Sequence, residues 1–200
     1  MSVALIDYGA GNLHSVHNAL RAAGAEDLLI TADPEAVARA DRIVLPGVGA
    51  FGACARGLRD IDGMVEALET RVLAQGAPFL GVCVGMQLMA ERGEELGVHQ
   101  GLGWIPGTVR HLSPSPAVRV PHMGWNDVIP AAGHPLIEPG EAYFLHSFAF
   151  EGEHVLATTD HGGPVPAAIG RDNVAGVQFH PEKSQRFGLA LLERFLAWRP

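Results

Sequence analysis

Short apolar runs alternate with helix-like patterns through the first half of this 200-residue chain, and this alternation limits its fold more than any other feature. The apolar runs have the length of buried strands, and the segments between them repeat apolar residues at helical spacing. Strands that alternate with helices predict βαβ units and a mostly parallel sheet with helices on both faces. Ligands bind such sheets at the carboxyl ends of the strands. We expect strands over residues 3–6, 28–30, 43–45 and 78–82, and helices over 13–20 and 64–73.

The second half has a different character. Seven prolines lie between residues 106 and 139 and divide the chain into short segments, which predict hairpins and loops appended to the sheet. Regular strands are expected again over residues 155–157 and 174–178, and an amphipathic helix over 187–198 closes the chain. The sequence contains no repeat, low-complexity tract or linker, so residues 1–200 are predicted to form a single domain.

Charge and cysteine content restrict the surroundings of the protein. Lys and Arg total 14 and Asp and Glu total 22, which gives a net charge of −8 and disfavours a nucleic-acid or acidic-membrane partner. There are two cysteines, fewer than a disulfide-linked secreted chain normally carries. The first residues resemble a strand rather than a signal peptide, and no apolar run approaches the roughly 18 residues of a membrane span. We therefore expect a cytoplasmic protein.

One cysteine lies in a turn that favours nucleophilic chemistry. Residues 81–87 read Gly-Val-Cys-Val-Gly-Met-Gln, and they follow a buried strand and precede an expected helix. The G-x-C-x-G spacing is the thiol version of a nucleophile elbow, in which flanking glycines permit a sharp turn. The N-terminus of a helix there favours the Cys83 thiolate, and the Val84 N–H can donate to an oxyanion. The alternative is a buried inert cysteine, which is our interpretation of Cys54, in a helical stretch without an elbow.

A thiolate needs a base, and the base needs an orienting group. His180 follows an apolar strand, and Pro181 favours extended geometry at His180. Residues two apart in an extended segment point the same way, so Glu182 should reach the His180 ring. The alternatives are a packing or surface histidine, or a metal ligand. No third ligand at suitable spacing supports a metal.

A second glycine-rich segment, residues 46–52, also follows a strand. Its glycines allow the backbone to approach a ligand or turn an N–H toward it. A phosphate loop would need Gly-Lys-Ser/Thr, which is absent, and the dinucleotide pattern that begins at Gly9 fails at His14. Taken alone, residues 46–52 are interpreted as a strand-to-helix turn.

Together these segments resemble the triad-type, class I glutamine amidotransferases. The order of the glycine-rich strand, the cysteine elbow and the C-terminal His-Pro-Glu is the same. Within that class the chain most resembles the glutaminase subunits of imidazole glycerol phosphate synthase, chiefly in the first-strand motif and in Pro-His-Met-Gly-Trp-Asn at 121–126. The resemblance implies an α/β, flavodoxin-like fold with an appended antiparallel region. The matching segments cover residues 6–12, 46–52, 81–87, 121–126, 143–148 and 177–184.

The resemblance also implies a role for each matching residue, with neither cofactor nor metal. The triad would be Cys83, His180 and Glu182, and the oxyanion donors would be the amides of Val48 and Val84. The glutamine pocket would contain Gly49, Gln87, Glu95, His146, Ser147 and Phe148, and the partner would face His122, Trp125, Asn126 and Lys183. Two departures are visible: Val84 replaces a larger aliphatic residue, and Phe148 replaces a common tyrosine, which removes a hydroxyl.

By the same resemblance, the chain would be a hydrolase that converts glutamine to glutamate and ammonia. It would form a heterodimer with a cyclase/synthase barrel, a lyase that uses ammonia to make imidazole glycerol phosphate and aminoimidazole carboxamide ribotide in histidine biosynthesis. Three alternatives stay open: a glutaminase of another class I enzyme, such as one for pyridoxal phosphate synthesis, a stand-alone cysteine hydrolase or peptidase, and a regulatory module without activity. The first disagrees with residues 121–126, the second predicts full activity without a partner, and the third disagrees with the intact triad.

Overall fold

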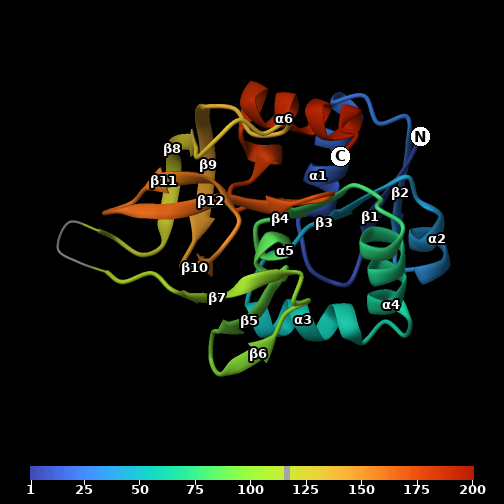
Figure 1. The fold of residues 1–200 in the computed structure, drawn as a ribbon, viewed down its shortest axis with the longest axis horizontal. Helices are drawn as coiled ribbons and strands as arrows, with labels where there is room; N and C mark the ends of the chain where they lie inside the picture. Colours follow the sequence, from blue (N-terminus) through green and yellow to red (C-terminus); the bar gives the residue numbers. More distant parts are fainter. Residues whose placement is uncertain (115–117) are drawn as a thin grey trace.

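The computed structural model describes residues 1–114 and 118–200; residues 115–117, which include Pro116, lie outside the described part. The parallel sheet predicted from the N-terminal half is present as one half of a nine-stranded sheet (Figure 1). The five strands of this half are parallel, and they coincide with apolar runs of the sequence. In spatial order they are β2 (Asp27–Thr31), β1 (Ser2–Ile6), β3 (Arg42–Leu45), β4 (Phe79–Val82) and β13 (Val174–Val177).

The proline-rich half supplies antiparallel strands, as predicted, and four of them extend the same sheet from β13. The large sheet is therefore mixed. These strands are β12 (Pro164–Arg171), β11 (Val155–Asp160), β8 (His122–Pro130) and β9 (Gly140–His146).

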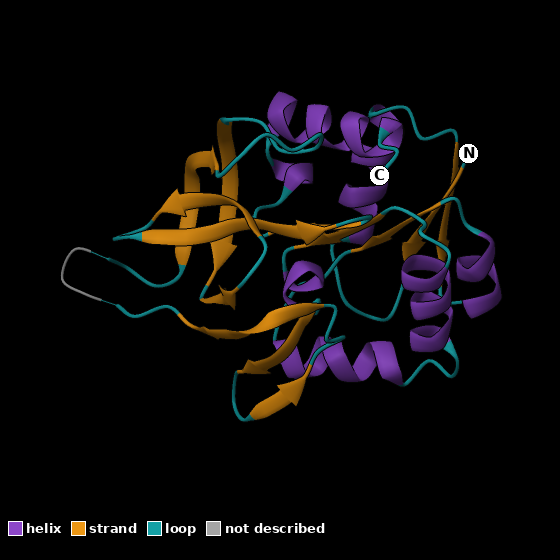
Figure 2. Ribbon diagram, viewed as in Figure 1, coloured by secondary structure: helices purple, strands orange, loops and turns teal. Residues whose placement is uncertain are grey.

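A second, four-stranded sheet lies beside the first and was not anticipated from the sequence (Figure 2). It contains one parallel and two antiparallel pairings. Its strands in spatial order are β10 (Phe148–Gly152), β7 (Ile105–His111), β5 (Ala90–Glu94) and β6 (Val98–Gln100).

Helices cover both faces of the parallel half (Figure 1). On one face lie α1 (Leu13–Ala22) and α6 (Gln185–Ala197). The other face carries α3 and α4, and the single helix expected over residues 64–73 is α4 followed by a π-helical segment, η1. None of the described helices is long and apolar enough to cross a membrane. The remaining bounds are α2 (Pro34–Arg39), α3 (Phe51–Arg59), α4 (Met64–Leu68) and η1 (Glu69–Ala74).

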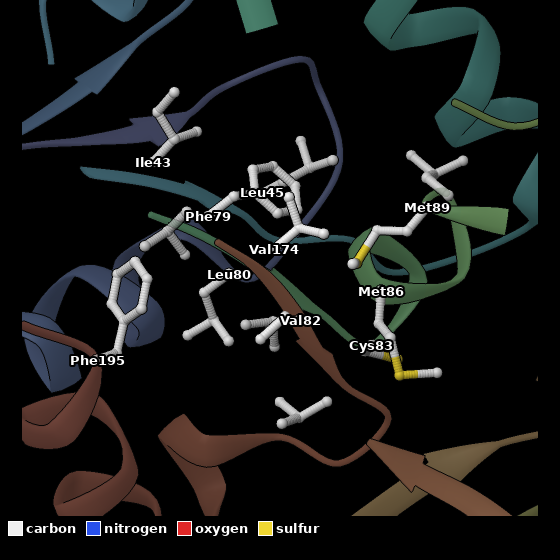
Figure 3. Packing of buried hydrophobic residues seen from close by; sticks show 14 of the residues in the cluster. Ile43, Leu45, Phe79, Leu80, Val82, Cys83, Met86, Met89, Val174 and Phe195 are labelled. Atoms are coloured by element: carbon white, nitrogen blue, oxygen red, sulfur yellow. The ribbon is translucent and has the colours of Figure 1, made fainter. Parts of the chain in front are cut away.

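The core surrounds β4, which pairs with β3 on one side and β13 on the other. Phe79 and Leu80 are fully buried, and a strand covered on both faces explains the uninterrupted apolar run of the sequence. Figure 3 shows these side chains along β4, with Cys83 beside Met86 where the strand ends. The rigid centre of the fold thus ends at the candidate nucleophile.

Candidate active site

Cys83 occupies a sharp turn directly after β4. Its backbone has φ 54° and ψ −113°, a conformation that side-chain-bearing residues rarely adopt. The two flanking glycines are required sterically. A Cβ on Gly81 would lie 2.7 Å from the Gly85 carbonyl oxygen, and one on Gly85 would overlap the Leu45 carbonyl oxygen. The sequence pattern therefore corresponds to a real elbow.

The helix expected after the elbow is only one turn long, α5 (Val84–Gln87). It ends early because the next carbonyls pair outside the helix: Leu88 O accepts from Leu102 N at 2.6 Å and Met89 O from Trp104 N at 2.9 Å. The prediction of a helix that stabilises the thiolate through its dipole is thus corrected to a single turn. Local N–H groups remain, but the dipole of a long helix does not.

His180 and Glu182 meet as predicted, although by a different backbone geometry. His180 Nδ1 lies 2.8 Å from Glu182 Oε1, and both side chains are almost fully buried. His180 is extended, but residues 181–183 form a 3-10 turn (Pro181–Lys183) rather than an extended segment. The turn is fixed to β9, because the His180 N–H donates to Tyr143 O at 2.9 Å and Ser184 Oγ accepts from Tyr143 N at 3.0 Å.

The surroundings of His180 favour its charged form. Burial alone would lower the pKa of the ring, but hydrogen bonds with the Cys83 thiol and the Glu182 carboxylate outweigh burial and raise the pKa to about 9. With Nδ1 turned to Glu182, Nε2 is the ring atom available to Cys83. Such an arrangement matches a thiolate–imidazolium pair whose imidazolium is oriented by a carboxylate.

A cavity of about 360 Å³ opens next to Cys83 and His180. Glu95 is held at its wall because its Oε2 accepts from the Phe51 N–H at 2.7 Å, at the start of α3. All six residues predicted for the glutamine pocket line this cavity, namely Gly49, Gln87, Glu95, His146, Ser147 and Phe148. Glutamine is small and polar, and a cavity of this volume and lining suits it.

The predicted oxyanion donors are not both aimed at the cavity. The Val84 N–H donates to the Gly47 carbonyl at 3.3 Å. Because the C=O and the next N–H of a trans peptide point in opposite directions, the Val48 N–H turns away from Val84. Two neighbouring carbonyls are held as well: Tyr8 Oη donates to Pro46 O at 2.6 Å, and Cys54 Sγ to Val48 O at 3.3 Å. A hole built from both amides requires rotation of the Gly47–Val48 peptide.

His122 was predicted to face a partner, but the structure buries it at 3% exposure. Sequence position could not reveal this, because His122 begins β8 and its ring turns inward to stack on Phe144 at 4.7 Å between ring centroids. His122 Nδ1 lies 3.0 Å from His146 Nε2, and Asn126 Nδ2 lies 3.0 Å from His122 Nε2. His122 therefore connects the partly exposed Asn126 to His146 on the cavity wall.

Of the other residues predicted at the partner surface, Lys183 lines the cavity, and Trp125 shares the Tyr143 ring with it. Trp125 is 47% exposed and packs edge-on to Tyr143 at 6.2 Å between ring centroids. Lys183 lines the cavity, and its Nζ lies 5.9 Å from the Tyr143 ring centroid. Met123 is also exposed, so an apolar patch borders the predicted active site.

The two buried histidines predict a pH-dependent stability. Burial is the main cause that lowers the pKa of His122 and of His146 to about 4, and repulsion from neighbouring histidines adds to it; at His146 the hydrogen bond to Phe148 O opposes the shift. In the unfolded chain these rings take up protons near pH 6.5, whereas in the folded protein they stay neutral until about pH 4. The stability that the neutral rings contribute to the folded state is therefore complete above pH 6.5 and is lost as the pH falls toward 4. We expect the unfolding free energy to fall by about 2 kcal/mol or more between pH 7 and pH 5. Thermal melting at both pH values measures this.

The matched variants are His122→Gln and His14→Asn, since His14 is exposed. His122→Gln should reduce the pH dependence, and His14→Asn should leave it unchanged. An unchanged slope in His122→Gln contradicts the assignment.

Gln178 was not predicted as a site residue, yet it is fully buried and donates to Cys83 Sγ at 3.8 Å. A glutamine at the end of an otherwise apolar strand was the signal in the sequence. Pro121 and Leu145 also line the cavity.

Within residues 1–114 and 118–200, no three His, Cys, Asp or Glu side chains are placed to hold a metal ion.

Comparisons with known proteins identify the family of this chain. A sequence profile described as "Glutamine amidotransferase class-I" matches residues 4–198. A Zymomonas mobilis protein named "Imidazole glycerol phosphate synthase subunit HisH" is 62% identical over 206 residues, covering 100% of this chain and 97% of that protein. The Rhodospirillum rubrum protein of the same name is 54% identical over 214 residues and covers 100% of both. A crystal structure of a glutamine amidotransferase has a TM-score of 0.77 at 19% identity over 98% of each chain, which shows a shared fold.

The chain therefore belongs to the class I glutamine amidotransferases. The predicted family is confirmed at this level. Within it, the chain belongs to the HisH subunits of imidazole glycerol phosphate synthase.

Proposed function

We propose that this protein hydrolyses glutamine to glutamate and ammonia with a Cys83–His180–Glu182 triad. The observation that carries the proposal is the buried 2.8 Å contact between His180 and Glu182 beside Cys83, at the wall of a cavity that suits glutamine. The HisH relatives support the same activity. We infer a single amidotransferase domain over residues 1–200, which the profile match to residues 4–198 supports.

The reaction proceeds in two halves. The Cys83 thiolate adds to the carboxamide carbon of glutamine and gives a tetrahedral oxyanion. Protonated His180 transfers its proton to the amide nitrogen, the C–N bond breaks and ammonia leaves a thioester. Neutral His180 then takes a proton from water as the water attacks the thioester, the C–S bond breaks, and glutamate is released with the thiolate–imidazolium pair restored. Glu182 keeps the ring oriented and stabilises its charge.

Ammonia in neutral water is mostly protonated and no longer nucleophilic. We infer that a second subunit receives it directly: a cyclase/synthase barrel, with which this chain forms a heterodimer that makes imidazole glycerol phosphate and aminoimidazole carboxamide ribotide in histidine biosynthesis. The names of the relatives support a synthase partner. The exposed Trp125 supports its position, because it packs on Tyr143, the ring that also approaches Lys183 of the cavity lining. The heterodimer would act in the cytoplasm, where its lyase subunit would use the ammonia that this glutaminase releases.

The test is a glutaminase assay on the isolated chain, on the complex with the barrel subunit, and on the complex with its acceptor nucleotide. Glutamate formation that depends on the complex supports the proposal. Full activity of the isolated chain would favour a stand-alone hydrolase, and no activity in any state would favour a regulatory module.

The two partners of Cys83 in the triad should differ in their effects. His180→Ala should remove nearly as much activity as loss of Cys83, because one ring serves both halves of the reaction. Glu182→Gln should be milder, since this residue orients the ring and transfers no proton. Glutamate release under saturating glutamine measures both variants in the complex. Wild-type rates for His180→Ala would exclude the triad.

Trp125 should contribute more to association than to stability. Large, partly exposed aromatic residues are frequent anchors of interfaces, and truncating one typically costs about 2 kcal/mol or more of binding. Trp125→Ala should therefore weaken binding of the barrel subunit by about thirtyfold, measured by calorimetric titration. A large drop in melting temperature with unchanged affinity would instead make Trp125 a packing residue. Exposed Leu73, on η1, offers Leu73→Ala as a control that should leave affinity unchanged.

A further inference from the structure

Gln178 is a buried polar side chain for which the triad mechanism gives no role. It has 0% exposure, and both ends of its amide have partners. Its Nε2 donates to Cys83 Sγ at 3.8 Å, and its Oε1 accepts from Gln87 Nε2 at 3.0 Å. Gln87 Nε2 also donates to Phe148 O at 3.0 Å. A chain of hydrogen bonds thus runs from the nucleophile through two amides to the backbone of β10.

The two ends of this chain fix the direction of both amides. Phe148 O can only accept, so Gln87 must turn its nitrogen toward it. The two hydrogens of that nitrogen are then used by Phe148 O and Gln178 Oε1. Gln178 consequently presents its oxygen to Gln87 and its nitrogen to Cys83, where a thiolate accepts. Gln87 Oε1 is the polar atom of its amide that remains for a ligand in the cavity.

We propose that Gln178 is a positioning residue that, together with Phe148 O, holds the Gln87 amide in the orientation in which the pocket presents an acceptor to an N–H group of the bound glutamine. The inference deepens the proposed glutaminase function and rests on it. Without Gln178, Phe148 O alone would hold the Gln87 nitrogen, so a half-turn of the amide that presents its NH2 group to the pocket would break one hydrogen bond instead of two. Two donors would then face the donor group of the substrate, and the buried amide would lose a partner.

Glutamine carries N–H donors at two places, its α-ammonium and its carboxamide. The Gln87 Oε1 acceptor could bind either of these groups. Glutamate γ-methyl ester separates them, because it keeps the α-ammonium and replaces the carboxamide NH2 with a methoxy group. Its carbonyl can still acylate Cys83.

The experiment uses the complex with the barrel subunit and compares wild type with Gln178→Met, which has similar volume and no hydrogen-bonding amide. Gln178→Glu retains an acceptor for Gln87 Nε2, and Gln100→Met is the control because Gln100 is exposed. We expect Gln178→Met to raise KM for glutamine about tenfold, as expected for one lost hydrogen bond. Gln178→Glu should return KM most of the way to the wild-type value, even where kcat remains low. Gln100→Met should match wild type.

Protection of Cys83 from iodoacetamide by glutamine reports occupancy of the pocket separately from the rate of hydrolysis, and it should weaken in Gln178→Met by the same factor as KM rises. A rise for glutamine alone supports contact with the carboxamide, and a rise for glutamine and the ester supports contact with the α-ammonium. Unchanged KM and protection for both ligands in a variant with the wild-type melting temperature overturns the inference. A weaker affinity for glutamine in Gln178→Met that Gln178→Glu fails to restore also overturns the inference. Neither outcome affects the proposed function, which the wild-type assay tests.

Discussion

Replacing Cys83 with alanine or serine is expected to abolish glutamine hydrolysis by the complex, with a loss of about 10⁴-fold or more. The thiolate is the atom that forms the bond to the carboxamide carbon, and no nearby group can substitute for it. Cys83 lies 4% exposed in a strained elbow, with His180 and Gln178 both directed at its sulfur. The fold should persist, because Ala and Ser fit the space of Cys in the same backbone. Glutamate release and thermal melting measure the two properties separately.

The second cysteine provides the control. Cys54 is buried on α3, and its thiol donates to Val48 O. Cys54→Ala should therefore keep most of the activity and should leave Cys83 open to a glutamine-analogue alkylator. Mass-spectrometric mapping identifies the labelled residue. Labelling at Cys54 in the wild-type protein would refute the assignment of the nucleophile.

The features that the sequence predicted well depend on short-range order. The apolar runs at β1, β3 and β4 and the helical spacing at α1 indicated buried strands and a covering helix, because burial on both faces leaves a local pattern. The His180–Glu182 pair was predictable since its members are two residues apart. Even there the backbone differed, as a 3-10 turn brings them together.

The features that were missed depend on tertiary contacts. Helix α5 stops after one turn because the N–H groups of Leu102 and Trp104, in the loop before β7, bind the next two carbonyls. His122 is buried because it stacks on Phe144 and His161, which no spacing in the sequence indicates. Gln178 acts through Gln87, which lies 91 positions earlier in the chain. The direction of the Gly47–Val48 peptide depends on rotation beside a glycine, which leaves no pattern at all.

That peptide accounts for the largest regulatory effect we expect. In the structure the Gly47 carbonyl, rather than the Val48 N–H, faces Val84, so the oxyanion of the tetrahedral intermediate would meet a carbonyl oxygen where a donor is needed. One missing oxyanion donor costs about a hundredfold to a thousandfold in rate. The isolated subunit should therefore hydrolyse glutamine slowly. Binding of the barrel and its acceptor nucleotide should accelerate it by about that factor, by favouring the rotated peptide.

Substitution at Gly47 itself is a poor probe of this switch. A Cβ there would lie 2.6 Å from Gly85 N and 2.8 Å from Tyr8 Oη, so Gly47→Pro or Gly47→Ala would disturb the elbow directly. Tyr8→Phe is a cleaner probe. It removes the hydrogen bond from Tyr8 Oη that holds the Pro46 carbonyl, next to the peptide that must rotate.

Loss of one hydrogen bond that stabilises only the unrotated strand is worth about 1 kcal/mol, so Tyr8→Phe should raise the rate of the isolated subunit about fivefold. The rate of the acceptor-loaded complex should change little, because rotation is already favoured there. Steady-state glutamate release from the isolated chain, the complex and the acceptor-loaded complex measures each step for both proteins. Equal wild-type rates in all three states would exclude the switch, and a slower isolated Tyr8→Phe subunit would show that Tyr8 supports the active strand instead of restraining it.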